Sequence, residues 1–547
     1  MGDTAGIGTD TSFDAIVIGS GIGGLTAGAI LSRLNGKRVL ILERHSVIGG
    51  LTHVFSRGRY KWDAGVHYVG RMKKGMRQRA ILDFITDNQV KWTAMPDPFE
   101  HFIYPGLSFK VSSSPARYQQ ELINRFPHAA RRIRKYFRDV KRVNNWFTRR
   151  YLSRVLPRPF AALLNLINLP GRKWAAMTTR DYFQRNFADK QLRTLLATQW
   201  CDYGTPPDES SFAMHALLVY HYIEGGFYPE GGTDRIAATV RTVLRRNAGE
   251  ILAHREVREI LVEGNRAVGV RVGNRRSPTA GDEYYYAPIV ISNAGAKRTF
   301  DQLVPSHIKD AVHDGLRGLE PGYSAVCVYA GLNDSPRKLG VRGENLWINR
   351  REEHATMKAQ TEALLSGTPA ACFVSFTTLR NGAAANHTMT IISLADYEAF
   401  AQWRVRDGTK KDGAYYALKK KLADSLIDLA QKHLPGLREM IAFTEVSTPL
   451  TMKRYTNRAQ GALYGLKHTP NFFRARALRA KTKLPGLYLC GADICTPGIT
   501  GAMMGGVATA SVISGPFGLA KVLSSCIAAS RNDTAVSESS AALAGAR

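Results

Sequence analysis

Cysteine pairs of the kind that bind metals or exchange disulfides are missing from this sequence. The six cysteines are scattered along 547 residues, and no two of them form a C-x-x-C pair. Their spacing speaks against zinc, iron–sulfur and dithiol sites, so we predict no metal centre. Sparse, unpaired cysteines are typical of free thiols in a reducing compartment, and they favour a cytoplasmic protein.

Long apolar runs are also missing. No run of the roughly eighteen apolar residues that a transmembrane helix requires occurs in the chain. The opening stretch MGDTAGIGTDTS has neither a basic n-region nor an apolar h-region, so the sequence predicts no secretory signal. Any contact with a membrane is therefore expected to be peripheral.

Acidic residues are scarce relative to basic ones. The chain has 75 Lys and Arg against 45 Asp and Glu, which gives a net charge of +30. Within residues 115–180 the only two acids are Glu121 and Asp139, against sixteen Lys and Arg. This basic helical pattern, with the short apolar segment 155–169, predicts peripheral binding to an anionic membrane. The alternative is a solvated basic face over a core helix. Nucleic acid is not predicted as a partner, since no helix-turn-helix, RNP or zinc-finger pattern occurs.

The clearest pattern that is present is a βαβ unit at residues 13–70. An apolar run of strand length leads into Gly19, Gly21 and Gly24 in the spacing G-x-G-x-x-G, and an amphipathic helical segment follows. Gly19 allows a tight turn, Gly21 lets the backbone approach a pyrophosphate, and Gly24 lets helix and strand pack closely. The start of the helix offers N–H groups to phosphates. The unit predicts a dinucleotide site; the alternative is a glycine-rich loop in an ordinary βαβ unit.

The residues at the end of the second strand indicate which dinucleotide binds. At this distance from the glycine motif, the Glu43 carboxylate can accept hydrogen bonds from the ribose of the adenosine half. Arg44 follows, and then the paired glycines Gly49 and Gly50 with Leu51. This pattern resembles the FAD-binding segment of the amine-oxidase and phytoene-desaturase superfamily, so FAD is the predicted cofactor. No second complete G-x-G-x-x-G unit occurs, so NAD(P) as an electron partner has no motif to support it.

Further separated segments extend the resemblance to the phytoene desaturase, carotenoid isomerase and retinol saturase family of FAD-dependent oxidoreductases. Together they cover the chain from about 13 to 520, and residues 62–68 with 447–451 favour the retinol saturase-like branch. Besides the glycine motif, the segments are 62–68 (WDAGVHY), 226–232 (GFYPEGG), 489–493 (LCGAD) and 498–502 (GITGA).

The resemblance implies an α/β fold, in which a Rossmann-like FAD-binding domain is interleaved with an α+β substrate domain. The predicted division is a first FAD-binding segment at 13–100, a substrate- and membrane-associating helical region at 101–224, a second FAD-binding segment at 225–299, the substrate domain at 300–460, a third FAD-binding segment at 461–526, and a disordered tail at 527–547.

The resemblance also implies further cofactor contacts. Asp493 would hydrogen-bond the ribityl or phosphate portion of FAD, or alternatively cap the helix that follows it. Gly501 and Ala502 would begin that helix, with its N–H groups facing the pyrimidine end of the flavin. Val257 lies on a strand that would contact the adenosine half through backbone groups.

His67 and Tyr68 are the predicted proton donors or acceptors. A flavin moves a hydride at N5, and saturation or desaturation of a C–C bond also moves a proton at the adjacent carbon. The alternative for His67 is a satisfied hydrogen bond in the core. Asp63 is expected to fix a turn or a neighbouring basic group, and Tyr228 either to line a substrate tunnel or to shape a turn.

The predicted function is FAD-dependent chemistry on the C–C bonds of a polyene or isoprenoid lipid. Saturation, desaturation and cis–trans isomerisation all remain open. One alternative is an amine-oxidase-like enzyme that oxidises a polar amine, which predicts an aromatic cage and hydrogen peroxide production. The other is a non-catalytic flavin fold that binds lipid, whose flavin a substrate would neither reduce nor reoxidise.

Overall fold

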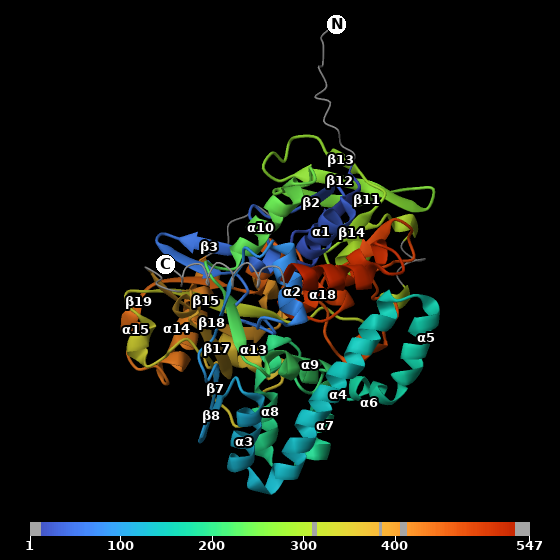
Figure 1. Cartoon of the computed structure of the whole chain (residues 1–547). Helices are drawn as coiled ribbons and strands as arrows, with labels where there is room; N and C mark the ends of the chain where they lie inside the picture. Colours follow the sequence, from blue (N-terminus) through green and yellow to red (C-terminus); the bar gives the residue numbers. More distant parts are fainter. Residues whose placement is uncertain (1–12, 309–313, 382–385, 405–412, 531–547) are drawn as a thin grey trace, which may run out of the picture.

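A parallel five-stranded sheet forms the centre of the nucleotide-binding region. The structure, a computed structural model, describes residues 13–308, 314–381, 386–404 and 413–530 (Figure 1). The strands are short and apolar, as expected for a sheet that is covered on both faces. Their order is β10 (Glu250–Leu252), β2 (Val39–Leu42), β1 (Ala15–Ile18), β14 (Val290–Ser292) and β20 (Leu487–Leu489), and all neighbours are parallel.

Three helices pack on this sheet through buried apolar side chains. They are α1 (Ile22–Asn35), α10 (Asp234–Arg245) and α18 (Gly498–Ile513). The sequence predicts an amphipathic α1, but α1 is buried on nearly every side because α18 covers the surface that would otherwise face water. Glycines permit this approach: a Cβ at Gly506 would lie 2.4 Å from the carbonyl oxygen of Gly23.

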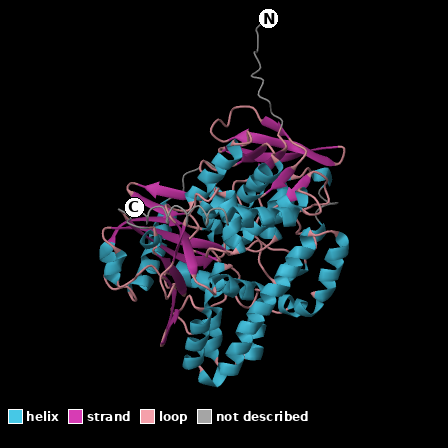
Figure 2. Cartoon of the chain, in the orientation of Figure 1, coloured by secondary structure: helices cyan, strands magenta, loops and turns pink. Residues whose placement is uncertain are grey.

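A mixed seven-stranded sheet forms the second region, at the left of Figure 2. Helices α13 (Met357–Ser366) and α14 (Gly413–Gln431) pack on it through a separate apolar cluster. Two of its strands come from residues 100–111, so the predicted helical region of the chain begins with strands of this sheet. The strand order is β19 (Ile441–Ser447), β15 (Ser324–Leu332), β18 (His387–Ala395), β17 (Ala371–Ser375), β16 (Asn345–Asn349), β7 (Glu100–Tyr104) and β8 (Leu107–Val111).

The basic segment 115–180 forms a helical region that projects below and to the right of both sheets in Figure 1. Helix α4 (Ala130–Val155) buries Ile133, Val140 and Trp146, and the basic residues of its first half are mostly exposed, which fits a solvated basic face over a core. Near its end, Arg150 and Arg154 instead turn inward and donate to backbone carbonyl oxygens. Helix α5 (Arg158–Ile167) differs, because none of its ten side chains is buried. Within the described ranges, no helix combines the length and apolarity needed to cross a bilayer.

The predicted disordered tail begins too early. Residues 527–530 continue a helical segment that starts at 518, so the prediction is wrong for these four residues. The reason is an apolar stripe at helical spacing, Leu519, Val522 and Cys526, which packs into the core beneath the parallel sheet. Residues 531–547 lie outside the described portion of the chain.

Candidate active site

A cavity of about 240 Å³ lies at the carboxyl edge of the parallel sheet. Because β1 pairs with β2 on one side and with β14 on the other, the strand order reverses at β1, which is the usual place for a ligand in such sheets. The residue that follows each of four strands lines this first cavity: Gly19, Glu43, Asn293 and Cys490.

Two glycine turns meet beneath this first cavity. Gly19 and Gly50 have left-handed φ angles of 95° and 58°. A Cβ at Gly50 would lie 2.8 Å from Cα of Gly21, so the second turn packs directly on the first. Gly24 and Gly49 do not line the cavity. A Cβ at Gly24 would lie 2.3 Å from the carbonyl oxygen of Gly19, which is the close packing of helix on strand that the motif predicts.

The Glu43 carboxylate joins these turns. Its Oε2 accepts hydrogen bonds from the backbone N–H of Ser20 at 2.9 Å and the Ser20 hydroxyl at 2.6 Å. Its Oε1 accepts one from the backbone N–H of His45 at 2.7 Å. An ionised carboxylate has about four acceptor sites, so one remains for a ribose hydroxyl. Glu43 therefore holds the loop in shape in addition to the predicted role.

Basic side chains surround a second carboxylate on the cavity wall. Glu256 accepts from Arg44 at 2.7 Å, from Arg275 at 2.9 Å and from Arg298 at 3.4 Å. Although burial opposes the shift, the neighbouring Arg44 and Arg275 guanidinium groups lower the pKa of Glu256 to about 2. Arg44, Leu51 and Val257 of the predicted cofactor residues line this wall.

Asp493 lies at the opposite wall and is largely buried. Its Oδ2 accepts from the backbone N–H of Ala296 at 2.8 Å, and its Oδ1 accepts from that of Leu466 at 3.2 Å. It therefore ties three loops together. The alternative of a helix cap is wrong, because α18 begins after Pro497 without a side-chain cap.

The start of α18 lies three residues earlier than the sequence predicts. Gly498 begins the helix and lines the first cavity, as does Ala502. Gly501 does not line it; a Cβ there would lie 2.2 Å from the carbonyl oxygen of Thr496. Its role is to let the preceding loop fold against the helix.

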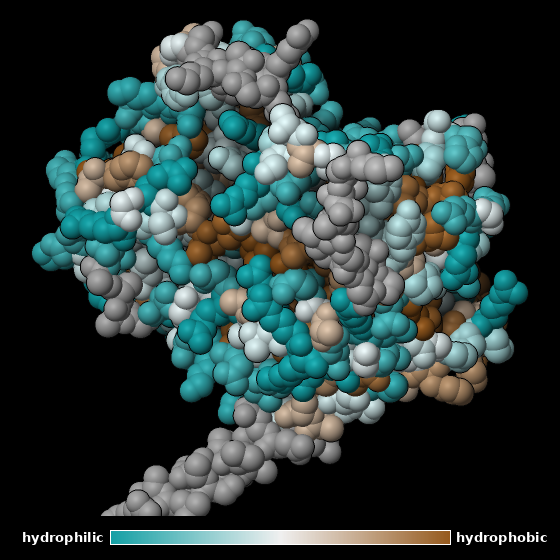
Figure 3. All heavy atoms as spheres, turned by 90° about the horizontal axis from the view of Figure 1, so that it is seen from above, coloured by the Kyte–Doolittle hydropathy of each residue, from teal (hydrophilic) through white to brown (hydrophobic). Residues whose placement is uncertain are grey.

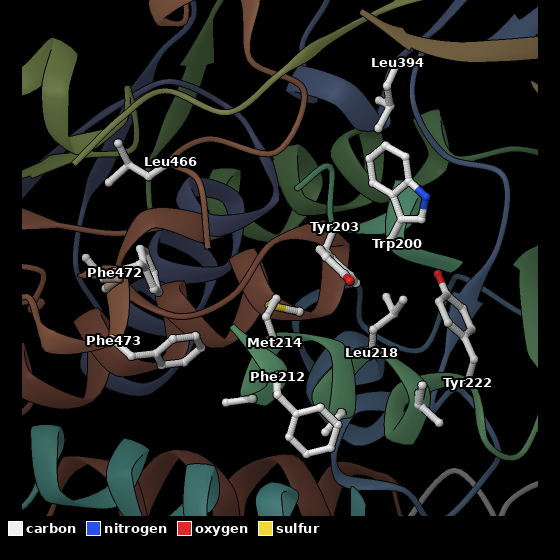
Figure 4. Close-up of a cluster of buried hydrophobic side chains, with 14 of the residues drawn as sticks. Trp200, Tyr203, Phe212, Met214, Leu218, Tyr222, Leu394, Leu466, Phe472 and Phe473 are labelled. Carbon is white, nitrogen blue, oxygen red and sulfur yellow. The ribbon is translucent and has the colours of Figure 1, made fainter. Parts of the chain in front are cut away.

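A second, smaller cavity of about 50 Å³ adjoins the first. Leu463 and Tyr464 line both cavities, and the chain passes from Val66 in the first to His67 in the second. Aromatic and apolar side chains form much of its wall. In Figure 4, Trp200 points toward Leu394, and Tyr203 lies below them. Leu218 extends from α9 (Phe212–Tyr222).

His67 faces the second cavity, and its ring contacts Phe373 edge-on at 5.4 Å between centroids. Its buried Nδ1 has no hydrogen-bond partner, so the predicted alternative of a satisfied core bond does not describe that atom. Burial, with the nearby Arg380 guanidinium, lowers the pKa of His67 to about 3. The imidazole is therefore neutral near pH 7.

Tyr68 lines neither cavity. Its hydroxyl donates to Oδ2 of Asp202 at 2.5 Å, and its ring stacks on Tyr222 at 4.2 Å between centroids. Burial and the neighbouring Asp202 raise the pKa of Tyr68 well above its ordinary value. The hydroxyl thus stays protonated at neutral pH and keeps its hydrogen bond to Asp202.

Asp63 and Tyr228 hold each other. Oδ2 of Asp63 accepts from the Tyr228 hydroxyl at 2.5 Å, and Oδ1 accepts from the Thr233 hydroxyl at 2.6 Å. The hydrogen-bond partners of Asp63 are therefore two hydroxyl groups, and not the neighbouring basic group that the sequence suggested. Tyr228 lines neither of the two cavities and lies on strand β9 (Gly226–Pro229), so the predicted turn is wrong for this residue.

Several residues of the site carry no sequence motif. Asn293 donates through Nδ2 to the carbonyl oxygens of Gly19 and Gly21, at 3.4 Å each. A signal for it was available, because it ends the apolar run 290–292 directly before a glycine turn. No comparable signal marks Asp202 or Glu100, whose proximity arises only from the packing of distant segments.

Comparisons with known proteins agree with this architecture. The family model of flavin-containing amine oxidoreductases matches residues 22–514. The all-trans-retinol 13,14-reductase of Macaca fascicularis is 32% identical, over 91% of this chain and 85% of that protein. The chloroplastic prolycopene isomerase of Daucus carota is 28% identical, over 94% and 82% respectively. The predicted resemblance to retinol saturases and carotenoid isomerases is thereby confirmed.

Solved structures share the fold. Putrescine oxidase bound to putrescine superposes with a TM-score of 0.61 at 15% identity, and the match covers 92% of this chain and 99% of that one. Similarity at this level bears on the fold alone. The predicted α/β fold with a parallel nucleotide-binding sheet is confirmed.

Proposed function

This chain belongs to the family of flavin-containing amine oxidoreductases, and on that premise we propose that it reduces a carbon–carbon double bond of a retinoid- or carotenoid-like polyene. It is an FAD-dependent oxidoreductase. The second cavity, aromatic-walled and adjoining the cofactor cavity, is the observation that carries the choice of substrate. Its free space of about 50 Å³ means that the lining side chains must move apart when a polyene enters.

The residues around the first cavity fit FAD. Helix α1 begins after Gly21 without a side-chain cap or an acidic residue in its first turn, so its N–H groups are open to a pyrophosphate. Arg298 and Arg458 add positive charge to the cavity wall. Glu43 keeps an acceptor site for the ribose of the adenosine half.

The protein's contribution to the reaction is to bind and shield. When bound, FAD supplies hydride transfer at N5. Trp200, Trp347 and Phe373 offer flat apolar surfaces on which a conjugated chain can lie, and they keep water away from the reacting carbons. The acid or base of the reaction comes from the polar groups of the same cavity, and His67 remains a predicted member of that set.

An anaerobic single turnover tests the proposal. The purified protein, loaded with FAD and reduced with dithionite, is mixed with all-trans-retinol, and NADPH replaces dithionite in a parallel sample. We expect loss of polyene absorbance and a product heavier by two hydrogens. A peroxide-forming reaction with putrescine in air, or a polyene left unchanged, would contradict the proposal.

Isomerisation is the second candidate, since a prolycopene isomerase aligns with 94% of this chain. The same turnover separates the two reactions. An isomerase returns a product of unchanged mass with a shifted spectrum, whereas a reductase adds two hydrogens and consumes one equivalent of reduced flavin.

We also propose that α5 docks the protein on an anionic membrane. Its side chains expose apolar surface, and basic residues flank it: Arg158, Arg172 and Lys173 are exposed. Figure 3, which views the molecule from above, shows brown apolar atoms exposed among teal hydrophilic ones. The most exposed apolar residues of this segment are Phe160, Leu163, Leu166, Ile167 and Leu169.

Two substitutions on α5 should release the protein from membranes. A double variant with Leu163→Glu and Leu166→Glu is expected to bind anionic vesicles about 100-fold more weakly, since it removes two leucines that would insert into the bilayer and adds two charges that the anionic surface repels. Vesicle flotation at low salt measures the effect. Tyr416→Glu, which changes an exposed aromatic residue on α14, serves as the matched control. A wild-type protein that fails to float with anionic vesicles would rule out the docking face.

A further inference from the structure

Two carboxyl groups lie near each other between the substrate sheet and the helical region, Glu100 buried and Asp202 half-buried. Glu100 on β7 is fully buried; its Oε2 accepts from Nε2 of Gln199 at 2.7 Å, and its Oε1 has no partner. Asp202, in the 3-10 helix Thr198–Asp202, accepts the hydrogen bond from the Tyr68 hydroxyl. Of the two, only Asp202 lines the second cavity.

Among the residues that the structure describes, neither carboxyl of this pair takes part in an ion pair with a cation. The groups around them are uncharged at neutral pH, because burial raises the pKa of the tyrosines and the cysteine and lowers that of the histidines. These groups are Tyr68, Tyr118, Tyr222, Tyr464 and Cys201, with His67 and His354 on the cavity wall; the Arg380 guanidinium lies beyond Tyr68.

The pair therefore keeps a proton near neutral pH. Burial raises the pKa of Asp202 well above its ordinary value. Burial, with the nearby Asp202 charge, does the same for Glu100. Each carboxyl disfavours the charged form of the other, so the two titrate as a pair and share a proton near neutral pH.

We propose that the Asp202 carboxyl donates the proton in the reduction of the polyene, an assignment that rests on the function proposed above. FAD, when bound and reduced, would supply the hydride that forms a C–H bond at one alkene carbon, and the proton that leaves the Asp202 carboxyl forms the C–H bond at the neighbouring carbon. The π bond is lost, the flavin is oxidised by two electrons, and a carboxylate remains. A two-electron reductant, dithionite in the test below, restores the flavin, and water restores the proton.

Asp202 is better placed for this step than the other candidates. His67 shares the cavity, but its neutral ring has no readily donated proton at pH 7. Glu353 also lines the cavity, but its side chain is 66% exposed and lies 3.9 Å from the Lys190 ammonium, so it is neither shielded from water nor free of a cation. Tyr68 is a positioning residue: the hydrogen bond that its hydroxyl donates stabilises the carboxylate left behind.

An Asp202→Asn variant tests the assignment, with Asp208→Asn as its matched control. Asp208 is on the same segment but forms an ion pair with Arg180 at 3.0 Å and lines neither cavity. With FAD-loaded, dithionite-reduced protein and all-trans-retinol, we expect D202N to slow the single turnover by about 10²–10⁴-fold. FAD affinity and thermal unfolding of D202N report whether the fold is retained.

Two further readouts do not depend on the overall rate of the loaded enzyme. The infrared carbonyl band of a protonated carboxyl should be present in the cofactor-free wild type and in D208N at pH 6, and diminished in D202N. In the wild type the turnover rate should fall as the pH is raised through neutrality, because the pair of carboxyls loses its shared proton, and D202E should restore some of the rate.

The outcomes distinguish a failure of this assignment from a failure of the function proposed above. A wild type that leaves the polyene intact overturns the proposed function and this assignment together. An active wild type with a folded D202N of equal rate overturns the assignment alone, as does an infrared spectrum of D202N that matches the wild type.

Discussion

A Gly23→Ala protein is expected to bind FAD more than about tenfold more weakly than the wild type and to unfold at a lower temperature. A Cβ at Gly23 would lie 2.7 Å from Cα of Gly491, 2.8 Å from Oδ1 of Asn293 and 2.9 Å from the carbonyl oxygen of Ala502. Two of these three atoms are backbone, so neither can turn aside as a flexible side chain would. Overpacking of this kind costs about 1–3 kcal/mol.

The loss of FAD follows from the position of Gly23 on the cavity wall. To admit a methyl group, α1 must move away from α18 and from the loop after β20, and its N–H groups move with it. FAD titration by fluorescence and a thermal scan with and without FAD measure the two effects. Gly281→Ala is the control, because a Cβ there meets no atom within 4 Å. A G23A protein that binds FAD as the wild type does would refute this account of the α1–α18 contact.

The free energy of unfolding is expected to fall steeply as the pH is lowered from about 6.5 to about 4. Burial lowers the pKa of five histidines from 6.5 to about 3, or about 4 for His354, so the folded protein does not protonate them in this range. The unfolded chain does, and unfolding therefore takes up protons. Each group contributes up to about 1.4 kcal/mol per pH unit. The five are His67, His215, His221, His354 and His468.

The acid pair acts in the opposite direction at higher pH. The folded-state pKa values of Glu100 and Asp202 are raised above their unfolded values, so the folded protein holds these protons more tightly. Their effect is absent at low pH, and it destabilises the fold as the pH rises from about 4 toward 8. The melting temperature should therefore pass through a maximum on the acid side of neutrality.

Melting temperatures measured from pH 4 to 9 test the expected loss of stability on the acid side and on the alkaline side of the maximum. The two ring nitrogens of His468 have no hydrogen-bond partner. His468→Gln should therefore reduce the number of protons taken up on unfolding, and with it the slope of stability against pH on the acid side, by about one proton. His307→Gln changes an exposed histidine and should leave the slope unaltered. An acid limb that is flat between pH 6.5 and 4 would show that these histidines are not buried in the native state.

The cofactor half of the molecule was largely predictable because its signals are local. Gly19 serves a turn and Gly24 a helix contact within one βαβ unit, Gly21 lines the first cavity, and Glu43 directly follows the next strand. Where prediction failed, the cause was packing between segments that are distant in the sequence. The helix through 518–530 was missed because its buried stripe has only three members, and the start of α18 because glycine tolerates both loop and helix.

Catalytic groups were harder to predict than cofactor contacts. His67 was found from its motif and does face the second cavity. Tyr68 was found from the same motif, but its hydroxyl is turned toward Asp202, a residue with no motif of its own. Burial decides the protonation state of all three, and burial is a property of the packed chain rather than of neighbouring sequence.

The sequence by itself determined the fold class, the cofactor and the family, because backbone requirements for glycine and runs of apolar strand residues can be recognised within a few positions. The tertiary structure alone decided two things. Gly23 occupies a position that the glycine motif leaves open, yet Gly491 and Ala502, from the far end of the chain, leave no room there for a side chain. The pKa of Asp202 is raised only because segments from separate regions of the chain pack around it, among them Tyr68, whose hydroxyl is its hydrogen-bond partner.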